Sequence, residues 1–135
     1  MPEPDVLILT PGGEDLARLY PWLDERAAAR RLPKPMLYGM HVALEEAAAN
    51  AAMHGFPDEI QVRLCCSDAA ATLVVEDNGR AFDPTVVSPA ARPASLAETK
   101  PGGLGLMLLR HYCADVNYER AGARNRLTLR FPLPA

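Results

Sequence analysis

Four short segments, in a fixed order along the chain, constrain its fold more than any other feature of the sequence. Each is polar or rich in glycine and alanine, and each is a weak signal when taken alone. Their separations suit one compact domain. In chain order, the segments are 46–50 (EAAAN, continuing to HG at 54–55), 77–79 (DNG), 82–84 (FDP) and 102–106 (GGLGL).

The composition is that of an ordinary soluble domain. The chain has 135 residues, which predicts one domain over 1–135, and it is 49% hydrophobic and 23% charged. The net charge of -3 argues against nucleic acid or an anionic membrane as the main partner. Because the sequence has no secretory signal pattern and no apolar run near the ~18 residues of a membrane span, we expect a cytoplasmic protein.

The cysteines favour reduced thiols in such a protein. Their number, three, is odd, and their spacing matches no metal site. Cys65 and Cys66 are neighbours on a predicted strand and would point to opposite faces of it. We therefore expect one of these two side chains in the core.

Hydrophobic periodicity predicts an α+β fold, a two-layer α/β sandwich with a mixed, mostly antiparallel sheet and helices on one face. The Pro-rich stretch that runs from about 84 to 103 is long for a loop in a compact domain, which is typical of functional or mobile segments. We predict strands at 6–9, 60–64, 72–76, 116–118 and 127–131, helices at 14–31, 36–53 and 104–113, a hairpin turn at 67–71, and a junction around Gly122 and Asn125.

Glu46 and Asn50 are four residues apart on a predicted helix and therefore share a face. A carboxylate and a carboxamide there can hold Mg²⁺ with its waters, or the carboxylate can orient or deprotonate a hydroxyl. The alternative is an incidental pair on a solvated face. The surrounding alanines leave room for a close approach. Glu45 is the second candidate for the carboxylate, about 100° around the helix.

Asp77 lies where a predicted strand ends, and its carboxylate could accept a hydrogen bond from an exocyclic amine such as adenine N6. Gly79 would let a base approach the backbone. The alternative is a simple hairpin, because Asn-Gly after a strand is a turn signal. The residues that follow do not alternate cleanly as a return strand would.

Gly102, Gly103 and Gly105 precede an apolar helix. A glycine-rich entry to a helix N-terminus offers free N–H groups and the positive end of the dipole, which suit phosphate. The alternative is a plain helix entry with glycines at turn positions. The segment matches neither the Walker loop nor the dinucleotide-binding fingerprint.

Other polar residues have simpler interpretations. His41 and His111 lie in apolar helical patterns and are expected to be structural or on the surface. His54, at a helix end, is expected to interact with the last carbonyls. A solvated helix face is expected for Arg18, Arg26, Arg30 and Arg31, and the alternative is that this face meets an acidic partner helix.

Taken together, the ordered segments resemble the GHKL (Bergerat-fold) ATPase superfamily, and within it the anti-sigma factor serine/threonine kinases of the RsbW/SpoIIAB type. Residues 46–55 (EAAANAAMHG) resemble the N box, 77–84 (DNGRAFDP) the G1 box with its Phe-Asp-Pro tail, and 102–106 (GGLGL) the G2 box. The resemblance covers about Leu37 to the C-terminus.

The resemblance implies ATP and Mg²⁺ as cofactors and a role for each matching residue. Asn50 would ligand Mg²⁺, Glu46 would be the general base toward a serine hydroxyl, and Asp77 would bind adenine N6. Pro84 to Pro101 would form the ATP lid. Lys100 would replace the basic residue that some relatives place at the position of Pro101. The implied nucleotide-binding set is Asn50, Asp77, Gly79, Phe82, Lys100, Gly102, Gly103, Leu104 and Gly105.

The resemblance also implies partners. Relatives of this kind bind a sigma factor, phosphorylate a serine of a small STAS-type antagonist, and commonly form homodimers. Two alternatives stay open from the sequence. One is a nucleotide-sensing or degenerate module that regulates a partner without phosphotransfer, and the other is a detached catalytic domain for histidine phosphotransfer.

Overall fold

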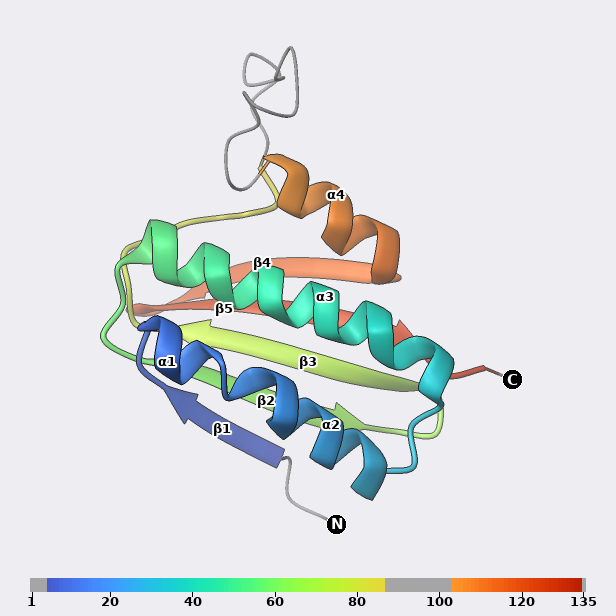
Figure 1. Cartoon of the computed structure of the whole chain (residues 1–135). Coiled ribbons are helices and arrows are strands. Elements are labelled where there is room, and N and C mark those ends of the chain that lie inside the picture. Colours follow the sequence, from blue (N-terminus) through green and yellow to red (C-terminus); the bar gives the residue numbers. More distant parts are fainter. Residues whose placement is uncertain (1–4, 87–102, 135) are drawn as a thin grey trace.

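The described part of the chain forms one antiparallel sheet with helices packed on one of its faces (Figure 1). The computed structural model describes residues 5–86 and 103–134. The strands are β1 (Asp5–Leu9), β2 (Ile60–Cys66), β3 (Ala70–Asp77), β4 (Asp115–Ala121) and β5 (Arg124–Pro132). The helices are α1 (Gly13–Leu16), α2 (Leu19–Ala29), α3 (Lys34–Asn50), the π-helical turn η1 (Ala51–Gly55) and α4 (Gly103–Tyr112).

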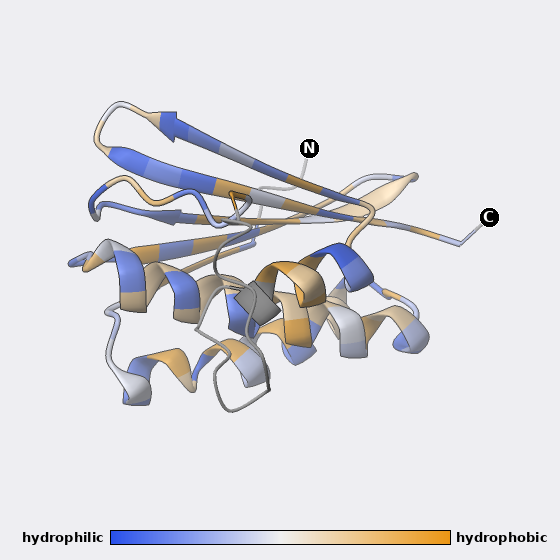
Figure 2. Ribbon diagram, turned by 90° about the horizontal axis from the view of Figure 1, so that it is seen from above, coloured by the Kyte–Doolittle hydropathy of each residue, from blue (hydrophilic) through white to orange (hydrophobic). Residues whose placement is uncertain are grey.

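The sheet confirms the predicted fold class. Its strands lie in the order β1-β2-β3-β5-β4, so β3 occupies the centre. The pairings among the described strands are all antiparallel, where the sequence analysis allows a mixed sheet. Figure 2, turned by 90°, shows the helices as one layer and the sheet as the other.

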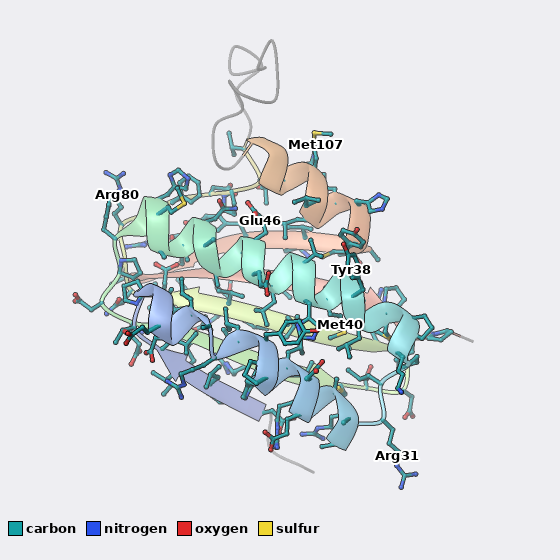
Figure 3. The ribbon with its side chains drawn as sticks, in the orientation of Figure 1. Arg31, Tyr38, Met40, Glu46, Arg80 and Met107 are labelled. Carbon is teal, nitrogen blue, oxygen red and sulfur yellow. The ribbon has the colours of Figure 1, made fainter. Side chains whose placement is uncertain are left out.

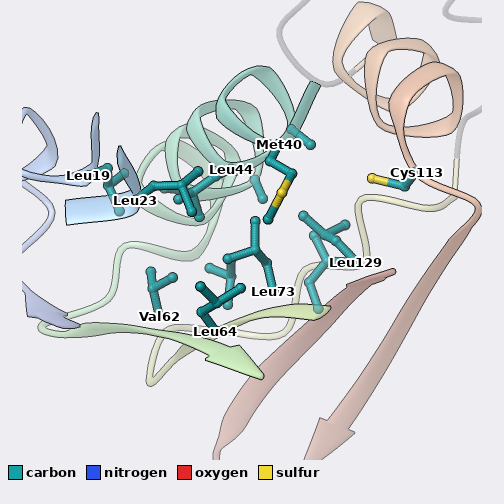
Figure 4. Packing of buried hydrophobic residues seen from close by; sticks show 14 of the residues in the cluster. Leu19, Leu23, Met40, Leu44, Val62, Leu64, Leu73, Cys113 and Leu129 are labelled. Atoms are coloured by element: carbon teal, nitrogen blue, oxygen red, sulfur yellow. The ribbon is translucent and has the colours of Figure 1, made fainter. Parts of the chain in front are cut away.

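The core lies between the two layers, because every second residue of the central strands points toward the helices. On β2 these residues are Ile60, Val62 and Leu64, each with 0% of its surface exposed. Leucines and methionines of α2 and α3 meet them from the other side (Figure 4). The buried residues labelled in that view are Leu19, Leu23, Met40, Leu44, Val62, Leu64, Leu73, Cys113 and Leu129.

The single helix predicted over 14–31 is wrong, because the structure has two helices there, α1 and α2. Pro21 explains the break. Inside a continuous helix its ring would clash with the carbonyl of Ala17 and its missing N–H would leave that carbonyl unpaired. Restarting at Leu19 places Pro21 in the first turn of α2, where no N–H is needed.

Arg26 and Arg30 also depart from the predicted solvated face. Nε of Arg30 lies 2.9 Å from Oδ2 of Asp5, and a nitrogen of Arg26 lies 3.7 Å from the other oxygen. Asp5 begins β1, so these pairs join α2 to the edge strand. Arg18 and Arg31 are exposed, as expected.

Two turns and the cysteines refine the predictions. The β2–β3 hairpin turns at Ser67–Ala69, but β4 and β5 turn at Gly122 and Ala123, so Asn125 belongs to β5. Gly122 has a φ of 62°, which a glycine adopts without strain. Contrary to prediction, Cys65 and Cys66 are both exposed, and Cys113 is the buried thiol. Cys65 points, like Arg63, to the face of the sheet opposite the helices, and Cys66, on the helical side, is the last residue of β2.

In the described residues no helix is both long and apolar enough to cross a membrane.

Candidate functional site

A small cavity lies where the C-terminal end of α3 meets the ends of β3 and β5. Its volume is about 20 Å³, room for about one water molecule. Three of the four predicted segments contribute residues to it, namely 46–50, 77–79 and 82–84. The lining residues are Ala47, Asn50, Ala51, Gly55, Val75, Asp77, Phe82, Pro84, Tyr118, Asn125 and Leu127.

The helix α3 carries the predicted pair Glu46 and Asn50 on the side that faces α4. Gly39, seven residues before Glu46, fixes this orientation, because a Cβ built on it would lie 2.8 Å from the ring of Tyr112 in α4. Figure 3 shows Glu46 on the side of α3 nearer α4. Glu46 is half-buried, whereas Glu45, the second candidate, is exposed. Neither carboxylate lines the cavity, which α3 reaches through Ala47 and Asn50.

Asn50 is buried, with 2% of its surface exposed, and lines the cavity. Its amide nitrogen finds no hydrogen-bond partner among the residues that the structure describes. An unpaired buried amide is costly, about 1–3 kcal/mol, and so calls for a partner beyond the described residues. Rotation about the last side-chain bond lets the same group present its oxygen instead.

Asp77, the last residue of β3, is also buried, at 3% exposed. Its Oδ1 accepts hydrogen bonds from the backbone N–H of Gly79, at 2.8 Å, and from Nδ2 of Asn125, at 3.0 Å. The hydrogen bonds of the described residues do not involve Oδ2 of Asp77. The carboxylate is therefore held in one orientation with an acceptor oxygen left for a ligand.

Gly79 is required by the protein's own backbone. A Cβ at this position would lie 2.3 Å from the carbonyl oxygen of Gly55 and 2.9 Å from Oδ1 of Asp77. The backbone N–H of Arg80 donates to the same Gly55 oxygen at 2.8 Å. The loop after β3 is thus tied to η1, and the absence of a side chain at Gly79 allows this contact. The approach of a base to Gly79 stays a prediction.

Asn125 is a site residue that the sequence analysis places in a turn. It pairs with Asp77 across β3 and β5, and its Nδ2 also donates to the carbonyl of Arg80 at 2.8 Å. Its Oδ1 accepts from the hydroxyl of Tyr118 at 2.5 Å and from Arg120 at 3.1 Å. No local signal reveals this role, because it depends on strand register between residues 48 positions apart.

Phe82 forms one wall of the cavity and stacks on His54. The two ring centroids lie 4.4 Å apart with an interplanar angle of 17°. The backbone N–H of Phe82 donates to Oδ1 of Asn125 at 3.3 Å. His54 does not interact with the last carbonyls of its helix as predicted; instead, Nε of Arg80 donates to the His54 carbonyl at 2.8 Å.

The glycine-rich segment is described in part. Gly103, Leu104 and Gly105 form the first turn of α4, which begins at Gly103 as the predicted helix entry requires. Lys100, Gly102 and the predicted lid between 87 and 101 lie outside the described residues.

The site fits a magnesium nucleotide better than a metal held by protein alone. Within the described residues, no cluster of three or more His, Cys, Asp and Glu side chains is placed to hold a metal. Mg²⁺ suits a site with few protein ligands, because it keeps several waters and binds substrate phosphates. The carboxamide oxygen of Asn50 is a suitable ligand, and Asp77 supplies an acceptor for an amino group.

Known proteins are similar to this chain in sequence. The family model of the histidine kinase-like ATPase domain matches residues 11–131. The serine/threonine-protein kinase BtrW of Bordetella bronchiseptica is 32% identical over 112 residues, which cover 80% of this chain and 79% of BtrW. The sensor-type histidine kinase PrrB of Mycobacterium tuberculosis is 29% identical over 143 residues, which cover 95% of this chain and 31% of PrrB.

A solved structure shows the same fold. The crystal structure of the RsbU and RsbW domains of Rv1364c from Mycobacterium tuberculosis matches with a TM-score of 0.71 and 17% identity. The match covers 99% of this chain and 34% of that one. The chain therefore spans about a third of the length of PrrB and of Rv1364c's solved chain, but most of BtrW.

The antiparallel sheet, the helices on one face and the family match define a histidine kinase-like ATPase domain, and the chain belongs to that family. It is similar to BtrW over most of both chains, and it shares its fold with the solved chain that contains an RsbW domain.

Proposed function

We propose that this protein binds Mg-ATP in the cavity and transfers the γ-phosphoryl group to a serine of a small partner protein. The observation that carries the proposal is the buried carboxamide of Asn50, whose Nδ2 has no partner among the described residues, one helical turn after Glu46 and in the same cavity as Asp77. Phosphoryl transfer needs side chains of this kind, because its catalysis depends mainly on positioning the reactants and on electrostatic stabilisation.

Each residue would have one task. Oδ2 of Asp77 would accept a hydrogen bond from the exocyclic amine of the base, while Oδ1 stays held by Gly79 and Asn125. Asn50 would hold Mg²⁺, which neutralises phosphate charge when it is bound. The half-buried carboxylate of Glu46 would accept the proton of the attacking serine hydroxyl.

The first turn of α4 would bind the phosphates. Gly103 and Gly105 lie at a helix N-terminus, where free N–H groups and the positive end of the dipole favour anions. Gly102, Leu104 and Lys100 would complete the contacts from the entry to this helix. The cavity is far smaller than a purine, so Phe82 and the following residues must move when the base enters.

The partners follow from the protein type. BtrW is named a serine/threonine-protein kinase, and we propose the same activity here. The proposed substrate is a serine of a STAS-type antagonist, and the proposed target for sequestration is a sigma factor, in the cytoplasm and as a homodimer. These assignments rest on the resemblance of the sequence to the RsbW/SpoIIAB type.

Two measurements, made one after the other, test the proposed function. Calorimetric titration of Mg-ATP into wild type and Asn50→Ala is expected to give binding that weakens in the variant, and that weakens in wild type when EDTA removes Mg²⁺. Phosphoserine formation on a STAS-type protein from the same genome then tests catalysis. Glu46→Gln is expected to lower its rate by about 100-fold or more, the usual contribution of a general base, with nucleotide affinity unchanged.

Glu14→Gln is the matched control, because it makes the same chemical change at an exposed position in α1. Its transfer rate should equal that of wild type. If Glu46→Gln transferred phosphate as fast as Glu14→Gln, Glu46 would not be the base. Tight Mg-ATP binding with no phosphoserine on any such partner would favour the nucleotide-sensing module instead, and acid-labile phosphate on a partner histidine would favour histidine phosphotransfer.

A further inference from the structure

A second, larger hollow lies on the helical layer, away from the nucleotide cavity. It is a groove of about 540 Å³ between α2 and the first three turns of α3, and it shares no lining residue with the cavity. On α3 the groove follows residues spaced three and four apart from Lys34 to Glu45, which is one continuous stripe of a helix.

The middle of the groove is aromatic and apolar. The rings of Tyr20 and Tyr38 line it with 53% and 67% of their residues' surface exposed, and Leu37 and Val42 are half-buried beside them. Tyr20 stacks on His41, with ring centroids 3.9 Å apart. Exposed tyrosines around an apolar floor are typical of protein-binding surfaces, because they combine a large contact area with low side-chain entropy.

The charges of the groove are separated along its length. Lys34 lies at one end, and the carboxylates of Asp24 and Glu45 lie further along. Helical rise places Lys34 and Glu45 about 16 Å apart along α3. Among the described residues, none of the three forms an ion pair with a Lys, Arg, Asp or Glu side chain; Asp24 contacts His41 at 2.8 Å.

We propose that this groove docks an amphipathic helix of a partner protein. The groove requires three features of this helix: an apolar stripe over the tyrosines, an acidic residue facing Lys34, and an arginine or lysine facing Asp24 and Glu45. In the partner helix, the basic residue would lie about 11 residues from the acidic one. The docking site lies on the same helix that carries Glu46 and Asn50. The proposal concerns a protein contact and stands whether or not the chain is an active kinase.

A charge-reversal experiment tests it. The probe is a fluorescently labelled, lactam-stapled helical peptide with leucines at i, i+3, i+4 and i+7 spacing, a glutamate near one end and an arginine 11 residues later. Anisotropy should show saturable binding to wild type. Replacing the peptide arginine by glutamate should weaken binding about fivefold, the value of one favourable surface ion pair. Glu45→Lys leaves Asp24 as the one carboxylate opposite this peptide residue, so it should abolish the preference between the two peptides.

Asp68→Lys is the charge-matched control, because it changes an exposed residue of the β2–β3 turn and should keep the wild-type preference. Tyr38→Ala should weaken both peptides while leaving Mg-ATP affinity unchanged. Equal binding of the two peptides to wild type would overturn the proposal. The same preference between the peptides in Glu45→Lys as in Asp68→Lys would also overturn it. Sedimentation gives a further outcome against the proposal. If wild type were a dimer and Glu45→Lys a monomer, a second copy of the chain would occupy the groove.

The readouts separate the two proposals. Failure of Mg-ATP to bind would remove the proposed kinase function and leave the peptide experiment intact. If phosphotransfer were normal and the peptide experiment failed, only the proposal that the groove docks a helix would be excluded.

Discussion

At the scale of residues, the site depends on side chains that hold other side chains. Asn125 is 5% exposed and uses both ends of its carboxamide, its nitrogen for Asp77 and its oxygen for Tyr118 and Arg120. Arg120 also donates to the carbonyl of Gly79 at 2.8 Å. The orientation of Asp77 is therefore set by neighbours on β4 and β5 as well as by its own loop.

Asn125→Ala should weaken Mg-ATP binding and lower stability together. Removing the carboxamide leaves the Tyr118 hydroxyl and the Arg80 carbonyl without this partner and takes from Oδ1 of Asp77 one of its two hydrogen bonds, at a cost of about 1–3 kcal/mol in the free energy of unfolding. Urea unfolding and calorimetric titration measure the two effects. Because Asp77 loses its fixed orientation, discrimination of ATP from GTP should also decrease.

Asn117→Ala is the control for that experiment, since Asn117 is an exposed asparagine on β4. It should change stability by less than about 0.5 kcal/mol. Equal effects of the two variants would show that Asn125 does not position Asp77.

At the scale of elements, α3 joins the whole site. It ends in the π-helical turn η1, and such wide turns frequently mark functional sites. The turn presents the Gly55 carbonyl to Arg80 and the ring of His54 to Phe82. At the other end of the helix, Gly39 receives the ring of Tyr112, so the same helix also sets the position of α4.

Gly39→Ala tests the α3–α4 contact. Alanine is the better residue in a helix interior by about 1 kcal/mol, but here its Cβ would lie 2.8 Å from Tyr112 Cδ1. We expect Gly39→Ala to lower the free energy of unfolding by about 1–2 kcal/mol in the wild-type background. With Tyr112→Ala present, the same change should raise stability by up to about 1 kcal/mol.

The double-mutant cycle uses urea unfolding of all four proteins, and the sign change between backgrounds is the decisive result. Additive effects would mean that Tyr112 moves aside freely and that its contact with Gly39 does not fix the position of α4.

At the scale of the whole molecule, the two faces of the sheet have different chemistry. Asp77 and Glu76 are consecutive on β3 and therefore point to opposite faces. Asp77 faces the helices and the cavity. Glu76 faces the other way, with its side chain 5% exposed among Arg63, Arg124 and Arg126, whose nitrogens lie 2.7, 3.3 and 2.7 Å from its oxygens. Glu76 thus ties together β2, β3 and β5.

The stability of the protein should decrease in acid through Glu76. Burial raises the pKa of this carboxyl, but the hydrogen bond from Arg126 and the charges of Arg126 and Arg63 outweigh it, so the folded pKa lies below the ordinary value. The contribution to stability is therefore complete above the unfolded pKa of glutamate, and it is lost as the pH falls through the lower, folded pKa.

Glu76→Gln should cost about 2 kcal/mol at pH 7, less than a fully buried pair because each arginine side chain is about one-third exposed. The difference from wild type should shrink as both are titrated into acid. Glu119→Gln is the matched control, an exposed partner of the same Arg126. A difference between Glu76→Gln and wild type that did not change with pH would exclude the ionised carboxylate as the cause.

Much of the fold and part of the site could be predicted from local pattern. The alternation of β2 and β3 and the alanine-rich run of α3 depend on neighbouring residues, and both elements form where predicted. The spacing of Glu46 and Asn50 is enough to place them on one face of a helix. The glycine-rich entry to α4 and the position of Asp77 at a strand end follow in the same way.

The sequence by itself determined most of the elements, their order and the side chains that we propose bind a nucleotide, because helical and strand periods depend on neighbouring residues. Only the tertiary structure decided which distant residues meet. Strand register brings Asn125 to Asp77, and packing presses Gly79 against Gly55. These contacts join residues far apart in the chain, and no local period encodes them.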